Sequence, residues 1–175
     1  MTALKPRRAI ATAGVLDAIG LLLRLGLAAV WLISGAIKVA DPGQFYSAVQ
    51  AYRIFDAGTA SLVSAVVPFL ELGLGVLLIA GLGTRLVAAL SALLLLVYIA
   101  GVAQSWARGL TIDCGCFGGG GQVAADHTHY GIEILRDTSF LVMAAWLLVR
   151  PASMVSVDRW LTGAPVDEKQ DDVNN

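Results

Sequence analysis

The chain has 175 residues, of which 57% are hydrophobic and only 14% are charged. A soluble domain has about 25% charged residues, and an apolar core alone does not explain so large a shortfall. The composition therefore predicts an integral membrane protein. The net charge of −1 at pH 7 provides no positive field for nucleic acid. With only two cysteines, a disulfide-rich scaffold is excluded, which leaves one redox pair or half of a metal site.

Four apolar segments are long enough to cross a bilayer, which takes about 20 residues. We expect these spans at 17–37, 60–81, 85–106 and 131–149. The first is too long for the hydrophobic region of a signal peptide, so we expect a retained helix. The predicted fold is all-α, an integral membrane four-helix bundle over residues 16–150. Residues 1–15 and the acidic, disordered segment 151–175 are expected to be cytoplasmic tails.

A shorter helix is predicted between the first two spans. Asp41 is a good N-cap, and Pro42 suits the first helical position. Phe45, Val49 and Tyr52 then recur at helical spacing, which indicates an amphipathic helix. We expect it to lie in the membrane interface. The competing interpretation is an ordinary packed helix within the loop.

The orientation of the spans is predicted from positive residues in short loops, which favour the cytoplasmic side. If both termini are cytoplasmic, seven basic residues lie inside and three outside. The inside set is Lys5, Arg7, Arg8, Arg85, Arg150, Arg159 and Lys169, and the outside set is Lys38, Arg53 and Arg108. The loop between the third and fourth spans, which holds both cysteines, is then extracytoplasmic. Disulfides persist in that compartment.

The cysteine loop carries the chemistry that we consider first. Cys114 and Cys116 are separated by Gly115, and glycines follow at 118–121. A disulfide across one intervening residue closes a tight ring, and strained disulfides are the more oxidising ones. We favour a pair that cycles between dithiol and disulfide, on a loop whose glycines present sulfur to a partner protein. A purely structural bond is less favoured, because so short a ring removes little unfolded-state entropy.

A metal site is the alternative use of the same cysteines. His127 and His129 would add two imidazoles to Cys114 and Cys116, and both residue types bind zinc or copper. The Cys-x-Cys spacing is nevertheless shorter than usual for zinc. His127 and His129 could equally be a polar stretch that enters the last helix.

Charged residues inside the apolar segments are costly and usually face the bundle interior. At 1.5 Å per residue, Arg24 and Glu71 are expected at depths close enough to pair. Lys38 is expected to extend to the outer interface. Arg136 and Asp137 lie on the same side of the membrane as the cysteines. Two roles stay open for these charges, either fixing helix register or taking part in proton or quinone traffic.

An ordered set of residues resembles the methylamine utilisation protein MauE family, within the broader DoxX-like group of small four-helix membrane proteins. The most specific part is the run from Asp113 to Gly118, Asp-Cys-Gly-Cys-Phe-Gly. The other matching residues are Arg24, Ser34-Gly35 with Lys38, Phe45, Tyr52, Pro68 with Glu71, and Arg136-Asp137. The resemblance covers residues 17–150.

The resemblance implies a protein that supports thiol–disulfide chemistry, often beside a thioredoxin-like partner. In the methylamine system that role is maturation of a disulfide-rich dehydrogenase subunit. The leading hypothesis is a membrane thiol–disulfide oxidoreductase component in which Cys114 and Cys116 exchange electrons with an extracytoplasmic thioredoxin-like or client protein. A quinone could serve as acceptor only by meeting this pair directly, because the chain lacks a second pair to relay electrons. Metal handling and a non-catalytic assembly subunit are the alternatives.

Overall fold

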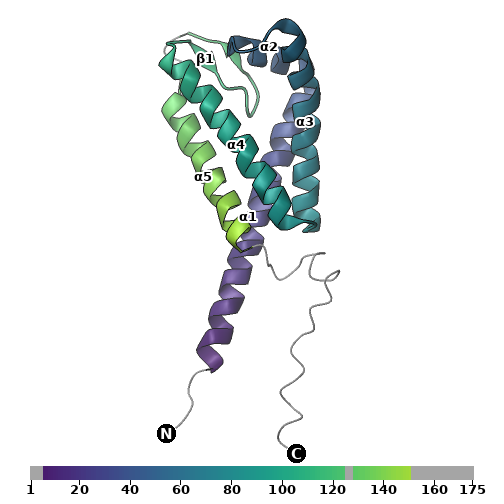
Figure 1. Ribbon diagram of the computed structural model, residues 1–175, viewed down its shortest axis with the longest axis vertical. Coiled ribbons are helices and arrows are strands. Elements are labelled where there is room, and N and C mark those ends of the chain that lie inside the picture. Colours follow the sequence, from purple (N-terminus) through teal and green to yellow (C-terminus); the bar gives the residue numbers. More distant parts are fainter. Residues whose placement is uncertain (1–5, 125–127, 151–175) are drawn as a thin grey trace, which may run out of the picture.

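The computed structural model describes residues 6–124 and 128–150, which form five α-helices and one two-stranded antiparallel sheet (Figure 1). The elements in chain order are α1 (Pro6–Ala40), α2 (Pro42–Ala51), α3 (Ala57–Ala80), α4 (Thr84–Ala107), β1 (Ile112–Asp113), β2 (Gly121–Gln122) and α5 (Tyr130–Val149). Four of the helices run lengthwise. The short helix α2 and the strands lie together at one end of the bundle, and the start of α1 lies at the other (Figure 1).

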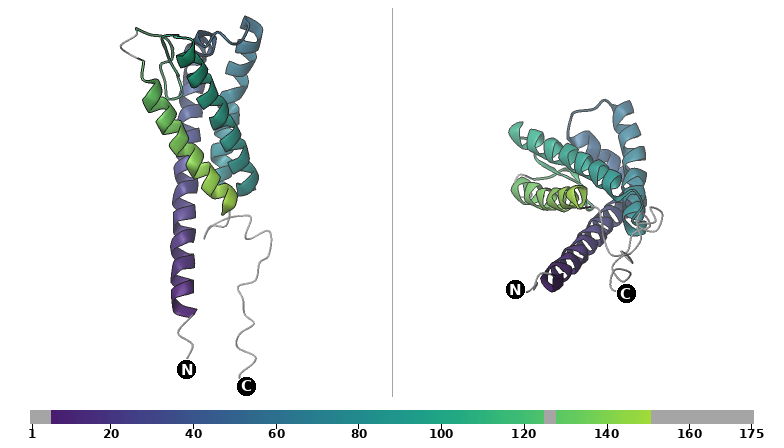
Figure 2. Two further views of the ribbon diagram at one scale, coloured as in Figure 1. Left: turned by 60° about the vertical axis from the view of Figure 1, so that its left-hand side comes forward. Right: turned by 60° about the horizontal axis from the view of Figure 1, so that its bottom comes forward.

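The long helices pack mainly as two pairs, α1 along α3 and α4 along α5, with α5 also touching α1. A turn at Gly81–Gly83 joins α3 to α4. Figures 1 and 2 show these two helices close together at the turn. They separate toward the end that holds α2 and the strands (Figure 1). This divergence leaves room for the cysteine loop to enter the bundle.

Three of the four predicted spans are confirmed as helices long and apolar enough to cross a membrane. Among the described residues these are Gly14–Ala40, Ala57–Ala80 and Thr84–Ala107. The predicted fourth span forms the helix α5, but Glu133, Arg136 and Asp137 in its first two turns set it apart from the other three. Its position in the membrane therefore stays a prediction.

Two helix boundaries bear on the sequence predictions. The helix α1 already begins at Pro6, inside the segment expected to be a tail. The helix α2 forms as expected, and the Asp41 carboxylate accepts a hydrogen bond from the Gln44 N–H at 2.9 Å. Its apolar face packs against Ala60 and neighbouring residues of α3, so this face is covered by protein. Its location at the membrane interface stays a prediction, and residues 151–175 lie outside the described part of the chain.

The all-α prediction missed the strands β1 and β2. They pair antiparallel, with Ile112 opposite Gln122 and Asp113 opposite Gly121. Two residues in each strand are too few to show a period-2 hydrophobic pattern, so the sequence contained no usable strand signal. The pair nevertheless fixes both ends of the cysteine loop.

Candidate functional site

The cysteine loop, residues 114–120, leaves the two strands and folds inward between the helices (Figure 1). The Ser34 hydroxyl of α1 lies 2.8 Å from the Cys116 carbonyl oxygen. Cys114 and Cys116 are free thiols, and each is only 7% exposed. The expectation that the glycines present sulfur outward to a partner is therefore wrong. The glycines instead let the loop pack closely inside the protein.

The close packing of the loop requires glycine at two positions. Gly115 and Gly120 have φ values of +69° and +94°, which L side chains rarely adopt. A Cβ at Gly120 would lie 2.6 Å from the Cβ of Ala48 on α2. Helix α2 also holds the loop through the Gln44 side chain, whose Nε2 donates to the Gly120 carbonyl at 2.6 Å. The Tyr52 hydroxyl, just after α2, donates to the Cys114 carbonyl at 3.1 Å.

The two thiols have different electrostatic environments. The Cys114 sulfur accepts hydrogen bonds from the Cys116 N–H and from the Arg136 guanidinium, each at 3.5 Å. A hydrogen bond from the Cys116 thiol lowers the pKa of Cys114, and the Arg136 contact lowers it further, against the opposing effect of burial. The same thiol–thiol bond and burial raise the pKa of Cys116 well above its ordinary value. Cys114 is therefore the thiol that ionises first.

The cation beside Cys114 comes from a distant part of the chain. Arg108 is the nearest cation in sequence, but its Nη1 donates to backbone carbonyls of Tyr52 and Arg53 at 3.2 and 3.4 Å. Arg136 from α5 occupies the position at the sulfur instead. Asp137 holds the guanidinium at 3.0 Å, and the ring of Phe117 lies 4.8 Å from its central carbon. These contacts fix Arg136 in place although 30% of its side chain is exposed.

Arg136→Gln is expected to slow alkylation of Cys114 at neutral pH and to move the pH profile of the reaction upward. The physical reason is that only the thiolate reacts, and the guanidinium favours the thiolate. The measurement is the rate of iodoacetamide modification across pH in a Cys116→Ser background. Arg108→Gln is the matched control and should leave the profile unchanged. Equal profiles for the two variants would contradict the role of Arg136.

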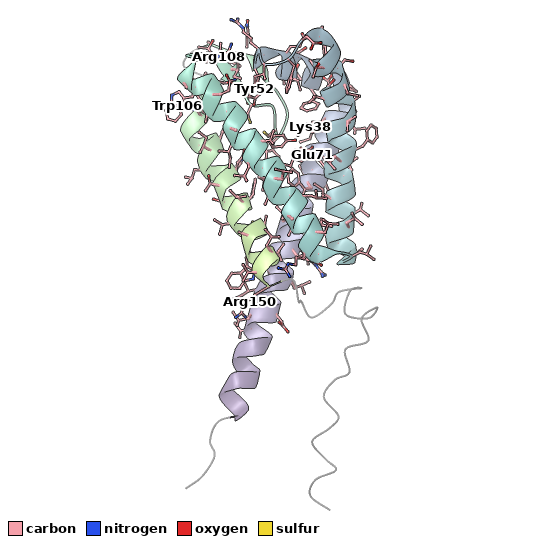
Figure 3. The ribbon with its side chains drawn as sticks, in the orientation of Figure 1. Lys38, Tyr52, Glu71, Trp106, Arg108 and Arg150 are labelled. Carbon is pink, nitrogen blue, oxygen red and sulfur yellow. The ribbon has the colours of Figure 1, made fainter. Side chains whose placement is uncertain are left out.

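A buried ion pair lies directly beneath the cysteine loop. Lys38 donates to the Glu71 carboxylate, and the Tyr98 hydroxyl donates to the same carboxylate oxygen at 2.6 Å. Ser34 lies 3.2 Å from both oxygens of Glu71 and accepts from Lys38 at 3.0 Å. Figure 3 shows Lys38 and Glu71 meeting inside the bundle, while Tyr52 and Arg108 lie nearer the end with the strands. Ser34 therefore connects the ion pair to the cysteine loop.

Two expectations about these charges are wrong. Lys38 is 3% exposed and does not extend to an interface, because Cα–Cβ bonds tilt toward the helix N-terminus and direct this side chain back into the bundle. The predicted partner of Glu71 is Arg24, but the structure pairs Glu71 with Lys38 instead. Arg24 is also buried, but it lies about 21 Å farther along α1 at 1.5 Å per residue. That separation is too large for both side chains to reach Glu71.

Two site residues were missed from the sequence. Tyr98 lies in an apolar span, and its hydroxyl donates to Glu71. A buried phenol needs a polar partner, so a tyrosine within such a span indicates a polar contact nearby. Glu133, in the first turn of α5, is the second missed residue. Its Oε1 accepts from the Cys114 N–H at 3.4 Å. Tyr52 was assigned to an apolar helix face, and the structure shows its hydroxyl on the loop instead.

The alternative metal site is only partly within the described residues, since His127 lies outside them. His129 lies at the start of α5. Within the described part of the chain, the group with suitable ligand geometry is Asp113, Cys114 and Glu133, with ligand atoms within 4.8 Å of one another. The Arg136 guanidinium already contacts the same sulfur, so a metal cation would meet a positive charge there. The arrangement favours a thiolate held by a guanidinium.

Comparison with known proteins identifies the family of the chain. The family model described as methylamine utilisation protein MauE matches residues 16–150, which include α2 to α5 and α1 from residue 16 onward. The chain belongs to the MauE family. It is 33% identical over 99 residues to the methylamine utilization protein MauE of Paracoccus denitrificans. That alignment covers 56% of this chain and 53% of the relative, so the chain spans about half the length of the curated relative. No solved structure matches the chain.

Membership of the MauE family and the three long apolar helices agree with each other. This MauE-family chain is a membrane protein. The membership confirms the resemblance found in the sequence, which rested mainly on the run from Asp113 to Gly118. The roles of the individual side chains are taken up below as proposals.

Proposed function

We propose that this protein is a membrane-bound thiol–disulfide exchange component that serves methylamine utilisation. The family name, and the same name on the Paracoccus denitrificans relative, support the link to methylamine utilisation. The observation that carries the exchange chemistry is the hydrogen bonding of the Cys114 sulfur to Arg136 and to the Cys116 thiol. Two adjacent thiols with opposite pKa shifts provide one nucleophile and one resolving group.

The exchange takes place in two balanced steps. The Cys114 thiolate attacks one sulfur of a partner disulfide, which forms a mixed disulfide and releases the other partner sulfur as a thiolate. The Cys116 thiol, after losing its proton to that thiolate, attacks the Cys114 sulfur and releases the second partner sulfur. The partner gains two electrons and the pair becomes a disulfide. The reverse sequence of the same steps oxidises a partner dithiol.

The orientation forms part of the proposal. The helix α5 is 20 residues long, about 30 Å at 1.5 Å per residue, and packs along α4. With α5 as the fourth span, the excess of basic residues favours both termini in the cytoplasm and the cysteine loop outside. The partner is then a thioredoxin-like protein, or a disulfide-containing client, on the extracytoplasmic side. Because the thiols are buried, the loop must open for this partner to reach Cys114.

Thiol trapping in intact cells tests the proposed exchange. Cys116→Ser leaves Cys114 without its resolving thiol, so a mixed disulfide with the partner should accumulate. Cys114→Ser is the matched variant and should accumulate far less, because the Arg136 guanidinium contacts the sulfur of Cys114, and burial still opposes ionisation of Cys116. Trapped partners should be extracytoplasmic. Mixed disulfides only with cytosolic proteins would contradict the orientation.

Two further outcomes of the trapping experiment would contradict the exchange. In the first, the wild-type pair never changes its redox state in cells. In the second, the Cys114→Ser/Cys116→Ser double variant supports growth on methylamine as well as the wild type. The second result would show that growth on methylamine does not require the two thiols.

A further inference from the structure

A cavity of about 270 Å³ lies between α2, α3, α4 and the cysteine loop, and Cys114 and Cys116 both line it. Lys38 of α1 and Tyr98 of α4 also belong to its lining. The aliphatic wall is contributed largely by Val49 of α2 together with Val63, Val67 and Leu94 of α3 and α4. The two cysteines are thus buried in the protein but adjoin an apolar space.

The mouth of the cavity is apolar as well. Ile54 and Phe55, between α2 and α3, are 49% and 43% exposed, and Val97 of α4 is 57% exposed. These three side chains are the most exposed apolar residues of its lining. Because α3 and α4 are long and apolar enough to span a membrane, lipid would surround these exposed side chains. A ligand that reaches the thiols through this mouth must therefore be soluble in lipid.

We propose that this cavity binds the ring of a lipid-soluble quinone, which accepts the electrons of Cys114 and Cys116. The inference rests on the thiol–disulfide function proposed above. An apolar cavity of about 150 Å³ already accepts benzene, so 270 Å³ has room for one substituted ring with its isoprenoid tail left in the lipid. Lys38 and Tyr98 already donate to Glu71, so the fit of the ring rests on the volume of the cavity, on its apolar wall and on the two cysteines that line it. An acyl chain offers no group that the cysteines can reduce, and a folded partner is too large to enter the cavity.

The chain contains only two cysteines, so it has no second pair to relay electrons. A quinone that meets Cys114 and Cys116 directly needs no such relay. The Cys114 thiolate bonds to a ring carbon of the quinone. The Cys116 thiol then attacks the Cys114 sulfur, so that the S–S bond forms, the C–S bond breaks and the electron pair stays on the ring. The ring takes the Cys116 proton and one further proton, equivalent to the one that Cys114 lost on ionising. The products are one disulfide and one hydroquinone, a two-electron, two-proton reaction.

Quinone reduction by the purified full-length protein in lipid nanodiscs tests this assignment. The reduced wild type should convert one decyl-ubiquinone to hydroquinone per cysteine pair, followed by the change in ultraviolet absorbance and by the loss of free thiols. Val97→Trp narrows the mouth and should slow the reaction about tenfold or more. Leu93→Trp is the matched control, because Leu93 lies one turn earlier on α4, is 60% exposed and does not line the cavity. It should react like the wild type.

A photoreactive quinone gives a second measurement that does not depend on the thiols. It should label the Cys114→Ser/Cys116→Ser double variant at the cavity, and Val97→Trp should reduce this labelling. Equal reaction rates for the two tryptophan variants, or thiols that do not react with quinone, would overturn the cavity assignment. Quinone reduction without any mixed disulfide in cells would overturn the protein exchange and leave the cavity assignment standing.

Discussion

Lys38→Met is expected to lower the free energy of unfolding by about 3–5 kcal/mol, since it leaves a buried carboxylate without its cation. Glu71 is 0% exposed, and the lysine is its ion-pair partner in the described structure. Methionine keeps the length of the side chain and removes only the charge and the donors. Removing one partner of a buried ion pair costs far more than removing a surface charge. The loss should appear in denaturant or thermal unfolding of the protein in bicelles.

Two companion variants show whether the charge itself causes this loss. Lys38→Met/Glu71→Gln removes both charges while the amide can still hydrogen-bond to Ser34 and Tyr98, so it should recover most of the stability. Arg108→Met removes an exposed cation and should cost less than about 1 kcal/mol. A double variant as unstable as Lys38→Met alone would show that the methionine, and not the unpaired carboxylate, damages the bundle.

Gly120→Ala is expected to lower stability by about 3 kcal/mol or more, and to expose the thiols. A non-glycine residue at φ +94° is strained, and the added Cβ would lie 2.6 Å from Ala48 and 2.7 Å from the Cα of Gly115. The loop can relieve these contacts only by moving away from α2. Cys114 and Cys116 should therefore react faster with a bulky maleimide than in the wild type. The measurements are unfolding in bicelles and the maleimide rate.

Gly131→Ala is the matched control for Gly120→Ala. Gly131 is a helical glycine of α5 with nothing within 4 Å of an added Cβ. Alanine there should stabilise the protein by about 0.5–1 kcal/mol and leave thiol reactivity unchanged. Equal stability of the two variants would show that the loop does not depend on close packing against α2.

Much of the helical framework could be predicted from the sequence, because hydropathy and capping are local properties. Asp41 and Pro42 indicate the start of α2, and the apolar segments indicate α1, α3 and α4. The charges in α5 weaken the same signal, although the helix itself forms. Local patterns thus predict which segments are helical better than they predict which segments lie in the membrane.

The site could be predicted only in part, because its geometry depends on how the helices are positioned along one another. Cys114 and Cys116 were identified from their spacing, and Arg136 was expected on the same side of the membrane. Glu71 was assigned the wrong partner because counting residues gives depth and not the direction of a side chain. The inward fold of the loop depends on the pairing of β1 with β2 and on the contact with α2, which no local pattern in the chain indicates.

The Ser34 hydroxyl has a single proton and three nearby acceptors, the two oxygens of Glu71 and the Cys116 carbonyl. It can donate to only one of them at a time. The ion pair and the cysteine loop therefore compete for one proton. If the Cys116 carbonyl moved away from Ser34, the hydroxyl would be left to donate to Glu71. The position of the cysteine loop and the hydrogen bonding of a carboxylate in the core of the bundle are linked through this one hydroxyl.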